Sequence, residues 1–167
     1  MVLTLPKVTV LMSVHNGEEH LNSAINSIIK QTFKDFEFII IDDHSLDKTQ
    51  KILDSVVDKR IHIIRNEKNY GLTRSLNIGL KLAKGQYVAR IDADDISHSS
   101  RLEQQVKYLD QNPNVVLVGT QANLINHHGK KVRGIPCVKR PCSYHAIKWF
   151  CMFDNPFYHS SVMFRPK

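Results

Sequence analysis

Two hydrophobic periodicities alternate along this chain, and that alternation limits its fold more than any other feature. Four short, apolar and largely β-branched runs occupy residues 8–12, 36–41, 61–64 and 87–91. Each is followed by a segment with apolar residues at helical spacing, in residues 21–31, 52–57, 72–83 and 102–109. Nearly continuous apolar strands that alternate with helices predict an α/β domain with a mostly parallel sheet, covered by helices on both faces.

The last third of the chain is less regular. We predict a fifth strand over 115–119, a hairpin turn at 127–130, a helix over 144–150 and a short strand over 161–164. No repeat, low-complexity segment or linker interrupts the sequence, so residues 1–167 are interpreted as one domain.

Composition excludes several classes of protein. No run approaches the ~18 apolar residues of a membrane span, and the N-terminus lacks the basic-then-apolar pattern of a signal peptide. Three cysteines in 167 residues are too few for a disulfide framework. We therefore expect a soluble, cytoplasmic domain.

Charge is distributed unevenly along the chain. Residues 1–112 contain 15 basic and 15 acidic side chains, whereas residues 113–167 contain eight basic ones and a single acid, Asp154. Such a segment suits phosphates, acidic glycans, nucleic acid or the inner face of an anionic membrane. A solvated basic face explains it equally well.

Polar residues follow the first two predicted strands, where parallel sheets bind ligands. Residues 13–18 are small and turn-forming, but they match neither the dinucleotide nor the P-loop pattern. A plain turn with a helix cap would also explain them. After the second strand, Ser45 or Asp47 can cap the next helix. Of the adjacent Asp42 and Asp43, one should point into the strand-end crevice.

The strongest signal follows the fourth strand. Asp92-Ala93-Asp94-Asp95 places three carboxylates within four residues, and their mutual repulsion opposes folding. A divalent cation would remove that repulsion, and oxygen-only ligands favour Mg²⁺ or Mn²⁺. Arg74, early in the third helix, could reach a phosphate or a base oxygen from the same edge.

These segments, in this order, resemble the family 2 glycosyltransferases, which have the GT-A (Rossmann-like) fold and use nucleotide-sugar donors. The matching segments are residues 6–18, 31–37, 41–47, 69–77, 92–95 and 155–165. The resemblance covers essentially the whole chain. It implies transfer of a sugar, with metal assistance and inversion, from a nucleoside-diphosphate sugar, with UDP favoured, to a glycan or lipid-linked acceptor of the cell envelope.

The resemblance also implies roles for individual residues. Those assigned to the donor nucleotide and its sugar are Ser13, His15, Asn16, Glu18, Asp43, Arg74 and Asp94. Of these, Asp43 would accept from a base N–H and Asp94 would lie near the ribose or sugar. Asp95 together with Asp92 would bind the metal of this DxD-type motif, and His159 would lie near the acceptor or the leaving diphosphate.

Three departures from the family pattern stand out. His15 stands where the family usually has Tyr, and His44 stands where it often has Gly; these changes weaken the assignment of uracil as the base. The catalytic carboxylate that usually follows downstream has no counterpart, since Asp154 precedes His159. We therefore expect this chain to end before the general base and to be inactive, or nearly so, by itself.

Three other classes of function stay open. A nucleotide-sugar-binding module without transferase activity would carry the same donor motifs. A nucleic-acid binder could use the basic last third, but that segment lacks the interleaved aromatic residues of a stacking platform, and we expect no nucleic-acid partner. A zinc site from Cys137, Cys142, Cys151 and His145 lacks any closely spaced cysteine pair.

Overall fold

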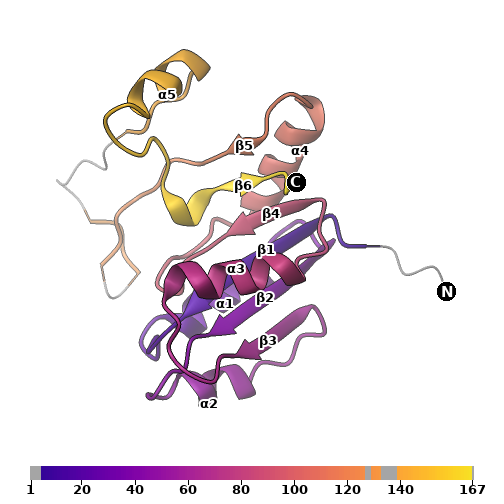
Figure 1. The fold of residues 1–167 in the computed structure, drawn as a ribbon, viewed down its shortest axis with the longest axis vertical. Helices are drawn as coiled ribbons and strands as arrows, with labels where there is room; N and C mark the ends of the chain where they lie inside the picture. Colours follow the sequence, from indigo (N-terminus) through magenta and orange to yellow (C-terminus); the bar gives the residue numbers. More distant parts are fainter. Residues whose placement is uncertain (1–4, 127–128, 133–138, 167) are drawn as a thin grey trace.

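The structure is a computed structural model that describes residues 5–126, 129–132 and 139–166. The chain folds in the order β1 (Val8–Val14), α1 (Leu21–Ile29), β2 (Phe36–Asp42), α2 (Thr49–Asp54), β3 (Ile61–Arg65), α3 (Leu72–Leu82), β4 (Tyr87–Arg90), α4 (Arg101–Gln111), β5 (Leu117–Val118), α5 (Tyr144–Phe150), the 3₁₀ turn η1 (His159–Ser161) and β6 (Met163–Phe164). The four predicted strand–helix repeats are therefore confirmed (Figure 1).

One sheet of six strands organises the molecule. Its order is β3-β2-β1-β4-β6-β5, in which the first four strands are parallel and β6 is antiparallel to both β4 and β5. The carboxyl ends of β1, β2 and β4 consequently lie along one edge, and the loops that follow them meet there. The α/β prediction with a mostly parallel sheet is correct.

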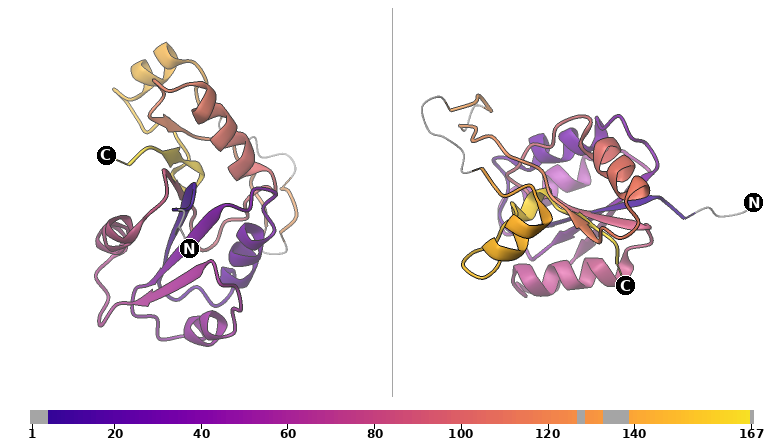
Figure 2. Two further views of the ribbon diagram at one scale, coloured as in Figure 1. Left: turned by 90° about the vertical axis from the view of Figure 1, so that its right-hand side faces the viewer. Right: turned by 90° about the horizontal axis from the view of Figure 1, so that it is seen from above.

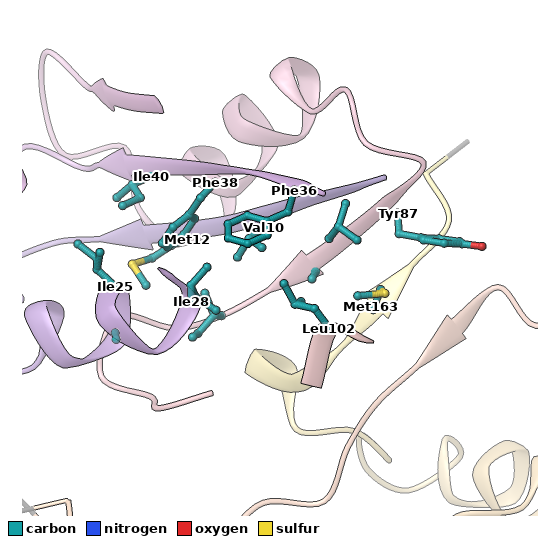
Figure 3. Packing of buried hydrophobic residues seen from close by; sticks show 14 of the residues in the cluster. Val10, Met12, Ile25, Ile28, Phe36, Phe38, Ile40, Tyr87, Leu102 and Met163 are labelled. Carbon is teal, nitrogen blue, oxygen red and sulfur yellow. The ribbon is translucent and has the colours of Figure 1, made fainter. Parts of the chain in front are cut away.

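Helices cover both faces of this sheet (Figures 1 and 2). Apolar side chains of α1, α2 and α4 pack with those of the strands in the larger core cluster, while α3 packs on the opposite face in a smaller one. Figure 3 shows Met12 and Ile40 of the strands beside Ile25 and Ile28 of α1, and all four are buried. Burial of a large aliphatic side chain contributes roughly 1.5–3 kcal/mol, so these clusters hold the strand ends in place.

The last third departs from the sequence prediction in detail. β5 has two residues instead of five, because it is an edge strand whose one partner within the described ranges is the two-residue β6. Ser161 belongs to η1 and not to the strand after it. The predicted helix over 144–150 is confirmed. An isolated antiparallel bridge joins Ile125 to Lys131 and supports the hairpin, two of whose turn residues, 127 and 128, lie outside the described residues.

Across the described ranges, every helix is too short or too polar to cross a lipid bilayer.

Candidate functional site

Reciprocal hydrogen bonds join the loops after β1 and β2. The backbone N–H of Asn16 donates to Ser45 Oγ at 3.0 Å, and Asn16 Oδ1 accepts from the backbone N–H of Leu46 at 2.8 Å. One residue further on, the N–H of Gly17 donates to Thr49 Oγ1 at 2.8 Å. We call residues 15–18 and 45–49 the paired loops. Because backbone N–H groups of each loop donate to side-chain oxygens of the other, these hydrogen bonds fix the two loops relative to each other at the carboxyl ends of β1 and β2.

Asp47 and Glu18 complete the pairing. Asp47 accepts from the backbone N–H of Glu18 at 3.0 Å and from that of Thr49 at 2.9 Å, at the start of α2. Glu18 Oε2 accepts from the backbone N–H of Lys48 at 2.9 Å. Of the two predicted helix caps, Asp47 therefore holds the first turn of α2, while Ser45 holds Asn16 instead. Glu18 has a structural partner here, and its donor-binding role stays a prediction.

Asp43 is buried and has several donors from the protein. Its Oδ1 accepts from Asn66 Nδ2 at 2.7 Å and from the backbone N–H of Tyr70 at 2.8 Å, and its Oδ2 accepts from the backbone N–H of Gly71 at 2.8 Å. Burial by itself raises the pKa of Asp43, but these bonds, with one from Ser75, outweigh it and lower the pKa below its ordinary value. Asp43 thus fixes the loop that leads into α3, and its bond to a base stays a prediction.

The neighbouring Asp42 is turned to the other face of β2. Its Oδ1 accepts from the backbone N–H of Ser45 at 3.0 Å. Its Oδ2 is buried and has no hydrogen-bond partner in the described part of the chain, with Arg65 Nε 4.0 Å away. Of the two adjacent carboxylates, Asp43 is the one on the α3 side of the sheet.

A cavity of about 390 Å³ opens at the ends of β1 and β4. It lies between the loop after β1, the start of α3 and the loop after β4. Its lining residues are Ser13, Val14, His15, Asn16, Gly17, Glu19, His20, Leu72, Asp92, Ala93 and Asp94. We call it the strand-end cavity. The structure therefore brings together five of the sequence-predicted residues: Ser13, His15, Asn16, Asp92 and Asp94.

His15 has a defined orientation at the mouth of this cavity. Its Nδ1 lies 2.9 Å from the backbone oxygen of Asp43, and since a carbonyl only accepts, Nδ1 carries the proton. Its Nε2 lies 3.3 Å from Asn16 Nδ2. These two contacts fix the orientation of the His15 imidazole, and the ring is exposed to solvent. Arg74, which is not among the lining residues, stacks on Tyr70 with 4.1 Å between its guanidinium carbon and the ring centroid.

The loop after β4 contains the predicted metal ligands. Asp92 Oδ1 accepts from Arg90 Nη2 at 2.9 Å and from Arg90 Nε at 3.1 Å, so this carboxylate is already paired. Asp94 and Asp95 are exposed. Partial burial raises the pKa of Asp95, a hydrogen bond with Ser160 lowers it, and the charges of Asp94 and Asp92 raise it further. The net upward shift in the pKa of Asp95 therefore comes first from desolvation, with smaller contributions from the neighbouring carboxylates.

Sequence reasoning missed Arg101, which lies beneath this loop. The guanidinium is buried; its Nη2 donates to the backbone oxygen of Arg90 at 2.7 Å and to that of Val162 at 3.3 Å, and its Nε donates to Gln105 Oε1 at 3.0 Å. Burial lowers the pKa of Arg101 to about 10, against the opposing effect of Asp95 and Asp92. Gln105 in turn donates to the backbone oxygen of Ser161 at 2.8 Å. The (i, i+4) pair of long polar residues on an apolar helix face was the available signal.

Arg101 and Gln105 together join the end of β4 to η1. Because Ser160 of η1 also hydrogen-bonds Asp95, this turn and the acidic loop form one unit. A second cavity of about 420 Å³ lies beside it, with Asp95, Arg101, Gln121 and Ser160 among its lining residues. His159 is exposed at the start of η1 and lines neither cavity, so its predicted role stays a prediction.

No preformed metal site exists within the described ranges, where no three His, Cys, Asp or Glu side chains gather closely enough to hold an ion. Asp94 and Asp95 offer the hard oxygen ligands that Mg²⁺ or Mn²⁺ requires, and their negative charges repel each other, so they fit such an ion if other ligands complete its shell. Of the cysteines considered for a zinc site and disfavoured by their spacing, Cys137 lies outside the described residues, and Cys142 and Cys151 are exposed free thiols.

An open, mostly parallel sheet with a polar cavity and a carboxylate loop at its carboxyl edge is the arrangement of α/β domains that bind ligands beyond their strand ends. The chain belongs to glycosyl transferase family 2, whose family model matches residues 9–162. The resemblance found in the sequence is thereby confirmed.

Curated relatives agree with that assignment. An uncharacterized glycosyltransferase of Haemophilus influenzae is 35% identical over 167 residues, which cover 96% of this chain and 52% of the relative. The amylovoran biosynthesis glycosyltransferase AmsE of Erwinia amylovora is 34% identical over 162 residues, which cover 94% of this chain and 59% of AmsE. The chain thus spans somewhat more than half the length of these curated relatives.

Solved structures of glycosyltransferases have the same GT-A fold. S. aureus TarS in complex with UDP is 27% identical, with a TM-score of 0.68 over 78% of this chain and 38% of that one. The mannosyltransferase PcManGT from Pyrobaculum calidifontis, at 21% identity, has a TM-score of 0.68 and covers 98% of this chain and 45% of that one. The GT-A prediction is correct.

Proposed function

We propose that this chain is the donor-binding part of a glycosyltransferase that uses a nucleoside-diphosphate sugar, with UDP as the favoured nucleotide. The observation that carries the proposal is the strand-end cavity, in which the polar loop after β1 faces Asp92 and Asp94 after β4. Family membership supports glycosyl transfer. TarS, which is related over most of this chain, has been solved with UDP and with UDP-GlcNAc, and this supports the choice of nucleotide.

In this proposal the base lies beside His15 and above Asp43, while the ribose or sugar lies near Asp94. His15 presents its imidazole face for stacking, and its ring is already held by the backbone oxygen of Asp43. Four protein donors, from Asn66, Tyr70, Gly71 and Ser75, already match the roughly four lone-pair sites of the Asp43 carboxylate, so a base N–H would have to share a site with one of them. Arg74, stacked on Tyr70, would supply positive charge at the rim.

Asp95 and Asp94 would hold a divalent cation together with the diphosphate. Such an ion neutralises charge on the departing diphosphate when it is bound. Because Arg90 already pairs with Asp92, we assign the main role to Asp95, with Asp94 beside it and Asp92 orienting the loop. The Ser160 bond and the buried Arg101 fix Asp95 relative to η1, which we propose faces the acceptor, a glycan or a lipid-linked sugar.

We propose that the general base is not among the described residues. Asp154 is the only described acid after Asp110; it pairs with Arg140 at 3.2 Å, and hydrogen bonds with the Asn155 backbone and with Arg140 lower its pKa. A lowered pKa makes Asp154 a weak base. General-base assistance contributes roughly 10²–10⁴-fold in rate, so this chain should bind donor with little transfer.

Calorimetric titration of UDP, GDP and ADP in the presence of Mn²⁺ tests the donor assignment. We expect UDP to bind most tightly, and we expect Asp94→Asn to weaken it because Asp94 lines the cavity. Asp35→Asn, which removes the same charge from the amino end of β2, is the matched control and should leave the affinity unchanged. A clear preference for GDP or ADP, or equal effects of both variants, would contradict the proposal.

A further inference from the structure

Helix α5 and the turn after it expose a cluster of large apolar side chains. Tyr144 is 72% exposed, Trp149 62%, Met152 66% and Phe153 69%. No residue of α5 is buried against the described part of the chain. Trp149 and Phe153 contact each other with ring centroids 4.7 Å apart, so these two side chains form one apolar surface. We call these four residues the α5 patch; large apolar side chains exposed together are a feature of interaction sites.

The surroundings of the α5 patch are basic. Lys139 and Lys148 are exposed, and neither takes part in a salt bridge among the described residues. The one acid nearby, Asp154, is paired with Arg140 at 3.2 Å. Apolar and aromatic residues flanked by lysine are typical of helices that lie in the interface of an anionic bilayer. A second copy of this chain would bring like charges together, which is unfavourable.

The position of α5 connects this patch to the site. Figures 1 and 2 show α5 at one end of the molecule, beyond β5. The Arg140 guanidinium carbon lies 5.1 Å from the ring centroid of Tyr158 and 6.0 Å from that of Phe150 in α5. Tyr158 directly precedes η1, whose Ser160 hydrogen-bonds Asp95. A surface bound by α5 would therefore lie close to η1.

From these observations we propose that the α5 patch docks the protein onto an anionic lipid surface, with Trp149 and Phe153 entering the interface and Lys139 and Lys148 meeting the headgroups. This docking needs neither nucleotide nor metal, so it can be tested independently of the donor-binding proposal. It would present η1 to an acceptor carried in the membrane.

The only tryptophan of the chain is Trp149, which makes it a built-in probe. Vesicles of phosphatidylcholine mixed with phosphatidylglycerol should bind the protein in flotation assays, shift the Trp149 emission to the blue, and allow quenching by brominated lipid. Vesicles of phosphatidylcholine alone should bind much more weakly. Replacing Lys148 by Glu reverses one charge and should weaken binding more than about fivefold, because one basic residue contributes about that factor.

Matched variants distinguish vesicle binding through the α5 patch from nonspecific adsorption. Phe153→Ser should weaken vesicle binding and keep Trp149 available as the probe, whereas Val57→Ser, at a residue 97% exposed beyond α2, should have no effect. Lys51→Glu on α2 is the charge control for Lys148→Glu. Absence of vesicle binding, or binding without a change in Trp149 emission, would overturn the proposal. So would emission that is already blue-shifted in buffer, or a dimer lost in Phe153→Ser, because protein would then cover the patch.

Discussion

At the scale of single residues, buried polar side chains determine the shape of the site more than exposed ones do. Asp43 and Arg101 are both buried, and each is held by several hydrogen bonds to elements distant in sequence. Their energetic role can be measured without any ligand.

Replacing Arg101 by Met should destabilise the fold and weaken donor binding. The change removes the guanidinium donor from the backbone oxygen of Arg90 and from Gln105 Oε1, while Val162 O keeps its bond from the Arg90 N–H, and we expect a cost of about 2–4 kcal/mol in the free energy of unfolding. Arg101→Lys should recover only part of this, since an ammonium lacks the guanidinium's fork. Urea denaturation gives the stability, and calorimetry with UDP and Mn²⁺ gives the binding.

The control for Arg101 lies at the opposite end of the sheet. Tyr87→Phe removes the hydrogen bond from the buried Tyr87 to Asp110, 2.6 Å long, and should lower stability by about 1 kcal/mol. It should leave UDP affinity unchanged. If Arg101→Met also left UDP affinity unchanged, Arg101 would support the fold alone.

Asp43 should make stability depend on pH in the acid range. Its pKa is lower in the folded state than in the unfolded chain, so its stabilisation is complete above the unfolded pKa of about 4 and is lost as the pH falls through the folded pKa. In Asp43→Asn, an amide NH₂ can face the N–H groups of Tyr70 and Gly71, and we expect a loss of about 1–3 kcal/mol at neutral pH. Thermal unfolding between neutral and acid pH should show a shallower slope for the variant; equal slopes would contradict the assignment.

At the scale of elements, the paired loops couple β1 to β2 above the sheet. Asp47→Ala removes the acceptor for the N–H groups of Glu18 and Thr49 and should cost about 1–2 kcal/mol. It should also speed hydrogen exchange at the amides of residues 16–18. Asp54→Ala, at the other end of α2, is the control. Equal hydrogen-exchange rates at residues 16–18 in the two variants would show that Asp47 is not needed to keep the paired loops together.

The regular elements were predictable from sequence, and the reason is their burial. β1, β2 and β4 are buried along nearly their whole length, so their apolar runs stand out, as do the faces of α1 and α4. β5 was overpredicted because its length depends on a partner only two residues long, which local sequence does not specify.

The site was predictable where chemistry is local and hidden where it depends on tertiary contacts. Three carboxylates within four residues are visible in the sequence, but the pairing of Asp92 with Arg90 and the burial of Arg101 are not. His44 shows the same limit. Its φ of 62° lies in the left-handed region, which explains why the family often has Gly there, yet only the structure reveals that conformation.

At the scale of the whole molecule, the proposed metal site needs ligands beyond the protein's own carboxylates. The described residues contain no preformed cluster of three metal-binding side chains. If Asp95 and Asp94 share an ion with the diphosphate, metal and nucleotide must each strengthen binding of the other by the same factor. Neither should bind tightly alone.

Calorimetry of this coupling tests the central claim most directly. UDP is titrated into the protein with and without Mn²⁺, Mn²⁺ is titrated with and without UDP, and both series are repeated with Asp95→Asn. We predict that Mn²⁺ strengthens UDP binding at least about tenfold, equivalent to about 1.4 kcal/mol, that UDP strengthens Mn²⁺ binding equally, and that Asp95→Asn abolishes both effects. Equal UDP affinity in EDTA and in Mn²⁺, or undiminished coupling in Asp95→Asn, would contradict the account.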